Sequence, residues 1–104
     1  MRRNADVMFN KLPKWFKEIV ITEESEKYDY GVIVISGRIK KYNLKFRCQG
    51  NIDEGWYSVE VKDDNAITNV EVDIAKIIND KNRCIKIIEK VVEIKNILEG
   101  GKEW

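Results

Sequence analysis

The stretch KYNLKFRC, residues 41–48, carries the clearest structural pattern in this sequence. Apolar and polar side chains alternate along it, which is typical of an antiparallel β-strand with one buried and one exposed face. The buried face would carry Tyr42, Leu44, Phe46 and Cys48. The exposed face would carry Lys41, Asn43, Lys45 and Arg47. A strand of this kind needs partners, and the sequence on both sides of it supplies them.

The flanking segments predict two further strands. Residues 28–36 are rich in β-branched and aromatic residues, and Val32–Ile35 is apolar throughout, which indicates a strand covered on both faces. Ser36–Gly37 would form the turn that follows. After a loop over Gly50–Gly55, apolar and polar residues alternate again over residues 56–62. The side chains of Tyr57, Val59 and Val61 would point toward the core. The three strands predict an antiparallel meander.

Helices are expected on both sides of this sheet. Pro13 suits the first position of a short helix over residues 13–20, because its missing N–H has no helical partner there. Further along, Thr68 and Glu71 have the spacing of a capping box, which predicts a helix from about residue 69. Its apolar stripe continues across the polar interval Asn79–Arg83. The sequence therefore allows one long helix over 69–99 or a break near that interval.

The polar run Thr22–Lys27 is typical of a solvated loop. The complete pattern predicts an α+β fold in one domain over residues 1–104, with a short N-terminal helix, a three-stranded antiparallel meander and a long or broken C-terminal helix. A chain of 104 residues that is 43% hydrophobic can form one core without disulfides or metal. Gly100–Gly101 would end the last helix and leave a loose tail over 100–104.

The composition excludes several classes of chemistry. There is no histidine, so Ser-His, Cys-His and His-metal sites are excluded in their ordinary forms. The six glycines form no phosphate-binding motif, and the net charge of +1 provides no general attraction to nucleic acid. We therefore expect a protein that is not an enzyme and that holds no metal or cofactor.

The location of the protein is predicted from its cysteines and its hydropathy. Cys48 and Cys84 both lie on apolar sides of their elements, and we expect buried, reduced thiols. No segment approaches the roughly 18 apolar residues that span a bilayer, and the N-terminus has no apolar leader. A cytoplasmic location is the expectation.

One enzymatic alternative stays open. Asp53, Glu60 and Lys62 resemble the D…(D/E)xK pattern of metal-dependent nucleases. In that arrangement two carboxylates would hold Mg²⁺, and the lysine would polarise water or phosphate. The resemblance implies a nuclease, while the same residues also suit an ordinary exposed strand.

A second alternative is nucleic-acid binding by the exposed face of the sheet. Basic side chains crowd one strand, and an aromatic ring lies on the next. Such a surface can follow a phosphate backbone and stack bases. The candidate residues are Arg38, Lys41, Lys45, Arg47 and Trp56. Nearby acidic residues offset this charge, and exposed strands also carry charge simply to resist edge pairing.

The C-terminal helix carries more apolar surface than one sheet face needs. Its apolar residues cover about half of its circumference at 100° per residue. Either the N-terminal helix covers the surplus, or a second chain does. The residues expected to meet a second chain are Ile87, Val91, Ile94 and Leu98. The favoured hypothesis is a non-enzymatic protein-binding module, such as an adaptor, an immunity protein or a small phage-type inhibitor. Its partner would be another protein or a second copy of itself.

Overall fold

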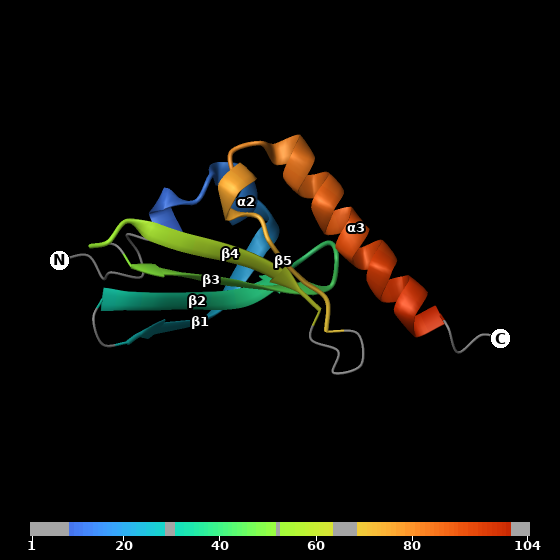
Figure 1. Ribbon diagram of the computed structural model, residues 1–104, viewed down its shortest axis with the longest axis horizontal. Helices are drawn as coiled ribbons and strands as arrows, with labels where there is room; N and C mark the ends of the chain where they lie inside the picture. Colours follow the sequence, from blue (N-terminus) through green and yellow to red (C-terminus); the bar gives the residue numbers. More distant parts are fainter. Residues whose placement is uncertain (1–8, 29–30, 52, 64–68, 101–104) are drawn as a thin grey trace.

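A five-stranded antiparallel sheet forms the frame of the structure, a computed structural model that describes residues 9–28, 31–51, 53–63 and 69–100. The strands lie side by side in chain order, which makes the sheet a meander (Figure 1). They are β1 (Val20–Lys27), β2 (Val32–Ile39), β3 (Leu44–Asn51), β4 (Trp56–Lys62) and β5 (Glu71–Asp73). The predicted α+β meander is confirmed, with β1 and β5 added at the edges of the three expected strands.

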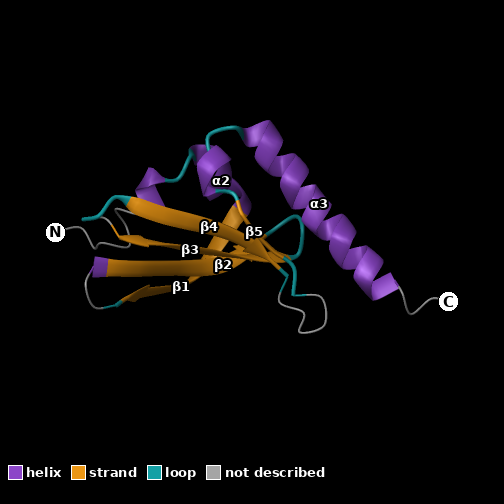
Figure 2. Cartoon of the chain, viewed as in Figure 1, coloured by secondary structure: helices purple, strands orange, loops and turns teal. Residues whose placement is uncertain are grey.

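The helical segments lie on one side of this sheet (Figure 2). They are α2 (Lys14–Ile19), the short 3-10 helix η2 (Ala75–Ile77) and α3 (Lys81–Gly100). The short N-terminal helix and the long C-terminal helix are thus confirmed. The Trp15 indole nitrogen donates a 2.9 Å hydrogen bond to the carbonyl of Ile78, which ties α2 to the segment before α3.

The core lies between the sheet and the helices. The rings of Phe16 and Phe46 meet edge to face at 5.5 Å between centroids, so α2 is packed directly on β3. Cys48 and Cys84 are buried and unbridged, as expected, and burial raises the pKa of Cys48 to about 12. The other buried core residues are Leu12, Val20, Ile33, Ile35, Ile39, Leu44, Val59, Val61, Ile74, Ile78, Ile88 and Val91.

The predicted loop over Thr22–Lys27 was wrong, because these residues belong to β1. The strand is at the edge of the sheet, and every residue after Val20 is exposed, so its side chains show no apolar alternation. Backbone pairing with β2 forms the strand instead. Charged residues and a bulge between Thr22 and Glu24 are features that protect an edge strand from pairing with other chains.

The predicted turn at Ser36–Gly37 was also wrong, because β2 continues through both residues to Ile39. A side chain at Gly37 would place its Cβ only 1.9 Å from the carbonyl oxygen of Ile21 on β1. Glycine is therefore needed here for close backbone approach between two strands. The chain turns at residues 40–43, where Asn43 has the left-handed φ of 53°.

The predicted helix start at residue 69 was wrong, and Thr68 lies outside the described residues. Glu71–Asp73 is strand β5. The Asp73 carboxylate accepts hydrogen bonds from the backbone N–H groups of Val59 and Ala75 at 3.0 and 2.9 Å, which anchors this segment to β4. Helix α3 begins only at Lys81, where the Asp80 carboxylate accepts the N–H of Arg83 at 3.2 Å. The break near Asn79–Arg83 is the alternative that the structure supports.

Helix α3 extends beyond the body of the domain. Its 20 residues correspond to about 30 Å at about 1.5 Å per residue. The helix runs obliquely past the end of the sheet, and its last turns lie away from the strands (Figure 1). Gly100 ends the described part of the chain as the last residue of α3, and the rest of the expected tail lies outside it.

Candidate functional site

The face of the sheet opposite the helices carries a row of cations. The strand register places Arg38 on β2 opposite Lys45 on β3, and Lys45 opposite Lys62 on β4. Arg47 lies one row further along β3, opposite Glu60. Arg38, Lys45 and Arg47, three of the five residues predicted to bind nucleic acid, are thus neighbours on the sheet. Lys62 lies beside them and was not predicted.

The other two predicted residues lie elsewhere. Lys41 is in the turn before β3, where its ammonium group lies 5.6 Å from the centre of the Tyr42 ring. Trp56 begins β4, six residues before Lys62 and so about 20 Å away at roughly 3.3 Å per residue. Its indole nitrogen donates a 2.7 Å hydrogen bond to the Glu54 carboxylate. Trp56 shares the outer face of the sheet with Arg47, and it lies four residues along β4 from the row of Arg47, or roughly 13 Å.

Carboxylates lie on both sides of the cations. On β1, Glu23 forms a 3.1 Å ion pair with Arg38, and Glu24 and Glu26 follow along the same strand. On the other side, Glu60 and Glu71 lie on β4 and β5. A phosphate backbone would meet these negative charges as well as the positive ones. The surface therefore lacks the uniformly positive charge that attracts a phosphate backbone.

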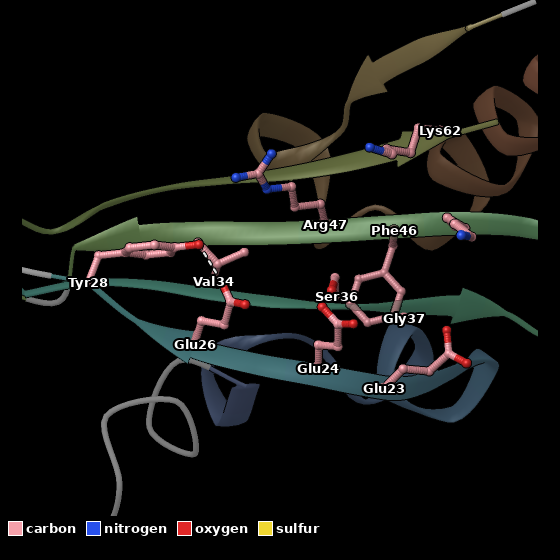
Figure 3. Close-up of a pocket in the computed structure, with 11 residues that line it drawn as sticks. Glu23, Glu24, Glu26, Tyr28, Val34, Ser36, Gly37, Phe46, Arg47 and Lys62 are labelled. Atoms are coloured by element: carbon pink, nitrogen blue, oxygen red, sulfur yellow. Dashed lines mark hydrogen bonds between the residues drawn. The ribbon is translucent and has the colours of Figure 1, made fainter. Parts of the chain in front are cut away.

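The charged residues enclose a groove of about 300 Å³ (Figure 3). Carboxylates from β1 line one side of it, and cations from β3 and β4 line the other. Tyr28 closes one end, and its hydroxyl donates a short hydrogen bond to Glu26 that raises the Tyr28 pKa. The sequence prediction missed this groove, because the expected loop over Thr22–Lys27 removed its acidic side.

Glu60 and Glu71 form a pair of carboxyl groups on adjacent strands. Burial raises the pKa of Glu60, and a hydrogen bond with Glu71 and their mutual repulsion raise it further. A carboxyl whose pKa is raised on folding stabilises the fold at pH values below its unfolded pKa of about 4.5. That contribution is lost as the pH rises through the folded pKa.

Replacing Glu60 by glutamine is expected to stabilise the protein at neutral pH, because it removes the repulsion with Glu71. The gain should stay below about 1 kcal/mol, since solvent screens these partly exposed groups. It should disappear at pH 4, which is below the unfolded pKa of Glu60, because Glu60 is then mainly protonated in the parent as well. Urea unfolding at the two pH values measures the difference. Glu89→Gln on the exposed side of α3 is the control, and an equal gain at both pH values would contradict the assignment.

The nuclease pattern is not assembled in the structure. Asp53 lies in the turn before β4, whereas Glu60 and Lys62 lie toward the far end of that strand. Trp56, at the start of β4, lies four strand residues or roughly 13 Å from Glu60. The Asp53 carboxylate lies at that same end of the sheet, 3.2 Å from where a Cβ at Gly31 would be, which is too far from Glu60 for shared coordination of one ion. Within residues 9–28, 31–51, 53–63 and 69–100, no group of three or more histidine, cysteine or acidic side chains could hold a metal.

The predicted protein interface on α3 divides into two parts. Val91 is 1% exposed and belongs to the core, and Ile87 is a partly buried residue packed against that core. We expected Val91 to contact a partner, but its side chain is buried inside the domain. Ile94 and Leu98 are 43% and 51% exposed. Ile97 is 65% exposed and was missed, because it lies outside the helical spacing that defined the stripe.

An ion pair between a partly buried lysine and a buried aspartate joins α3 to the end of β4. The Lys95 ammonium lies 3.7 Å from the carboxylate of Asp63, a buried residue directly after β4. Lys95 lies between Val91, in the core, and Leu98, in solvent. The exposed aliphatic side chains are thus held on a helix that is anchored next to them.

Comparisons with protein-family models, with curated proteins and with solved structures find no match for this chain. Among the described helices, none combines the length and the apolar character that crossing a membrane requires.

Proposed function

We propose that the protein is a non-enzymatic protein-binding module whose contact surface is the exposed end of α3. The observation that carries the proposal is the exposure of Ile94, Ile97 and Leu98 on the part of the helix beyond the sheet. Each such side chain gains about 1.5–3 kcal/mol on burial. Their spacing of i, i+3 and i+4 is the one with which an amphipathic helix fills an apolar groove of its partner.

A different protein suits this surface better than a second copy does. A standard interface buries about 800 Å² on each partner, and three aliphatic side chains on one helix supply only part of that area. The groove described above is lined mainly by charged and polar residues, so a second copy does not present an apolar groove there. An adaptor, immunity protein or small inhibitor acting in the cytoplasm fits these features, and the unbridged cysteines fit a reducing compartment.

The test replaces Ile94 and Leu98 by lysine together. Partner binding is expected to fall by about 100-fold, because two apolar anchors at the centre of an interface contribute about 1.4 kcal/mol or more each. The fold should survive, since both side chains are about half exposed. The partner is first captured from the native host with the tagged parent protein, and its affinity is then measured with purified components by calorimetry.

The matched control is the double variant Asn82→Lys and Asn96→Lys. Both asparagines are exposed. At about 100° per residue they lie about 120° and 160° around α3 from Ile94, Asn82 is also twelve residues away along the helix, and the control adds the same charge. The control is expected to bind as the parent does. Equal loss in the control and the test variant, or unchanged affinity in the test variant, would contradict the proposal. A parent that binds no protein would contradict it as well.

A further inference from the structure

The groove on the outer face of the sheet has two walls of opposite charge and a floor of small residues. Glu24 and Glu26 of β1 form the acidic wall (Figure 3). Arg47 of β3 and Lys62 of β4 belong to the basic wall. Val34, Ser36 and Gly37 of β2 form the floor between them. The shape follows from the order of the strands, because the small residues occupy the strand in the middle.

Glu24 and Glu26 on one wall form no ion pair with Arg47 or Lys62 on the other, among the residues that the structure describes. Glu24, Ser36 and Arg47 lie in one row across the sheet, so β1 and β3 are two strand spacings apart. That separation is roughly 10 Å between backbones at about 4.8 Å per spacing. The groove therefore presents opposite charges to a ligand that lies along it.

We propose that this groove binds an extended segment of another protein in which basic and acidic residues alternate. Successive side chains of an extended chain point to opposite sides, so those of a segment lying in the groove face the two walls in turn. Side chains on the same side of an extended chain are two residues apart, or about 6.6 Å, and this spacing is the same in the bound segment and in the strands that form the walls. Basic side chains then meet Glu24 and Glu26, while acidic side chains meet Arg47.

The geometry also distinguishes this ligand from others. A nucleic acid carries charge of one sign and would be repelled by the acidic wall. A peptide with its charges in blocks can satisfy only one wall at a time. This proposal uses the face of the sheet opposite the helices and is independent of the surface on α3.

The test uses isotope-labelled full-length protein and a synthetic peptide of alternating lysine and glutamate. The control peptide has the same composition, with its lysines and glutamates in two blocks. In an NMR titration at low salt, the alternating peptide is expected to shift the amides around Glu24, Ser36 and Arg47 and to saturate. The block peptide should bind about fivefold more weakly, since several exposed charge pairs each contribute modestly. Equal binding of the two peptides would overturn the proposal.

Charge reversal tests the two walls separately. Arg47→Glu or Glu24→Lys reverses one charge in the row across the sheet that the two residues share, and each change should weaken binding by about tenfold through like-charge repulsion. If the reversal at Arg47 impairs folding, Arg47→Gln removes the charge without that risk and should still weaken binding.

Two further outcomes would overturn the proposal. One is unchanged peptide binding in Arg47→Gln, which would place the site elsewhere. The other is tighter binding of a single-stranded oligonucleotide than of the alternating peptide at the same salt concentration. The α3 double variant Ile94→Lys and Leu98→Lys should bind the peptide like the parent, so failure of the protein-binding proposal and failure of this one are distinguishable.

Discussion

Replacement of Gly37 by alanine is expected to destabilise the protein by about 3 kcal/mol or more, because the new methyl group has no space. Its carbon would lie 1.9 Å from the carbonyl oxygen of Ile21 and 3.0 Å from the amide nitrogen of Glu23. Both atoms belong to the backbone of β1 and cannot move aside as a flexible side chain can. Strand β1 would have to shift away from β2 or detach from it.

Chemical denaturation measures the loss, and hydrogen exchange of the β1 amides shows where it occurs. The controls are Gly55→Ala and Gly100→Ala, where a Cβ meets no atom within 4 Å. Gly55 has a φ of 79°, so its alanine variant should lose about 1 kcal/mol to backbone strain. Gly100→Ala should be close to neutral. A Gly37 variant as stable as these controls would contradict the close strand approach.

Replacement of Val91 by lysine is expected to unfold most of the protein. Val91 is 1% exposed and lies in the core with Cys84 and Ile88. An unpaired ammonium there costs more than about 4 kcal/mol, a large part of the 5–15 kcal/mol that stabilises a typical domain. From the sequence we expected Val91 to meet a second chain, whereas the side chain is buried within the domain itself.

The same substitution at Leu98 is the comparison. Leu98 lies seven residues further along on the same side of the helix, but it is about half exposed. Leu98→Lys should change the free energy of unfolding by less than about 1 kcal/mol. Thermal melts followed by circular dichroism test both variants. Equal stability of the two would mean that α3 does not pack on the sheet as described.

Alternation of apolar and polar residues identified the part of the fold that is buried on one face. Leu44, Phe46 and Cys48 point into the core as predicted, and so do Val59 and Val61. Tyr57 was expected inside and is 37% exposed, because it lies near the open end of the sheet, opposite Gly50. The alternating pattern thus predicted which face of the sheet each side chain points to. How deeply each side chain is buried depended on where it lies in the sheet.

The candidate surfaces could be predicted only in part. The cations of β3 were found because they alternate with the core residues. The acidic wall was missed because Glu24 and Glu26 lie on β1, whose residues after Val20 are all exposed. The segment therefore shows no alternation of buried apolar and exposed polar residues that would mark it as a strand. On α3, helical spacing placed Val91 and Leu98 in one stripe, but spacing carries no information on where the sheet ends.

The sequence by itself determined the α+β class, the central strands, the buried thiols and the absence of histidine-based chemistry, since composition and local alternation contain these features. Only the tertiary structure decided that residues 20–27 and 71–73 are strands and that α3 begins at Lys81. Edge strands form through backbone hydrogen bonds, which nearly every residue type can make, so their side chains need not show a pattern. The groove and the exposed end of α3 likewise depend on which strands are neighbours and where the sheet stops, and both are properties of packing across distant parts of the chain.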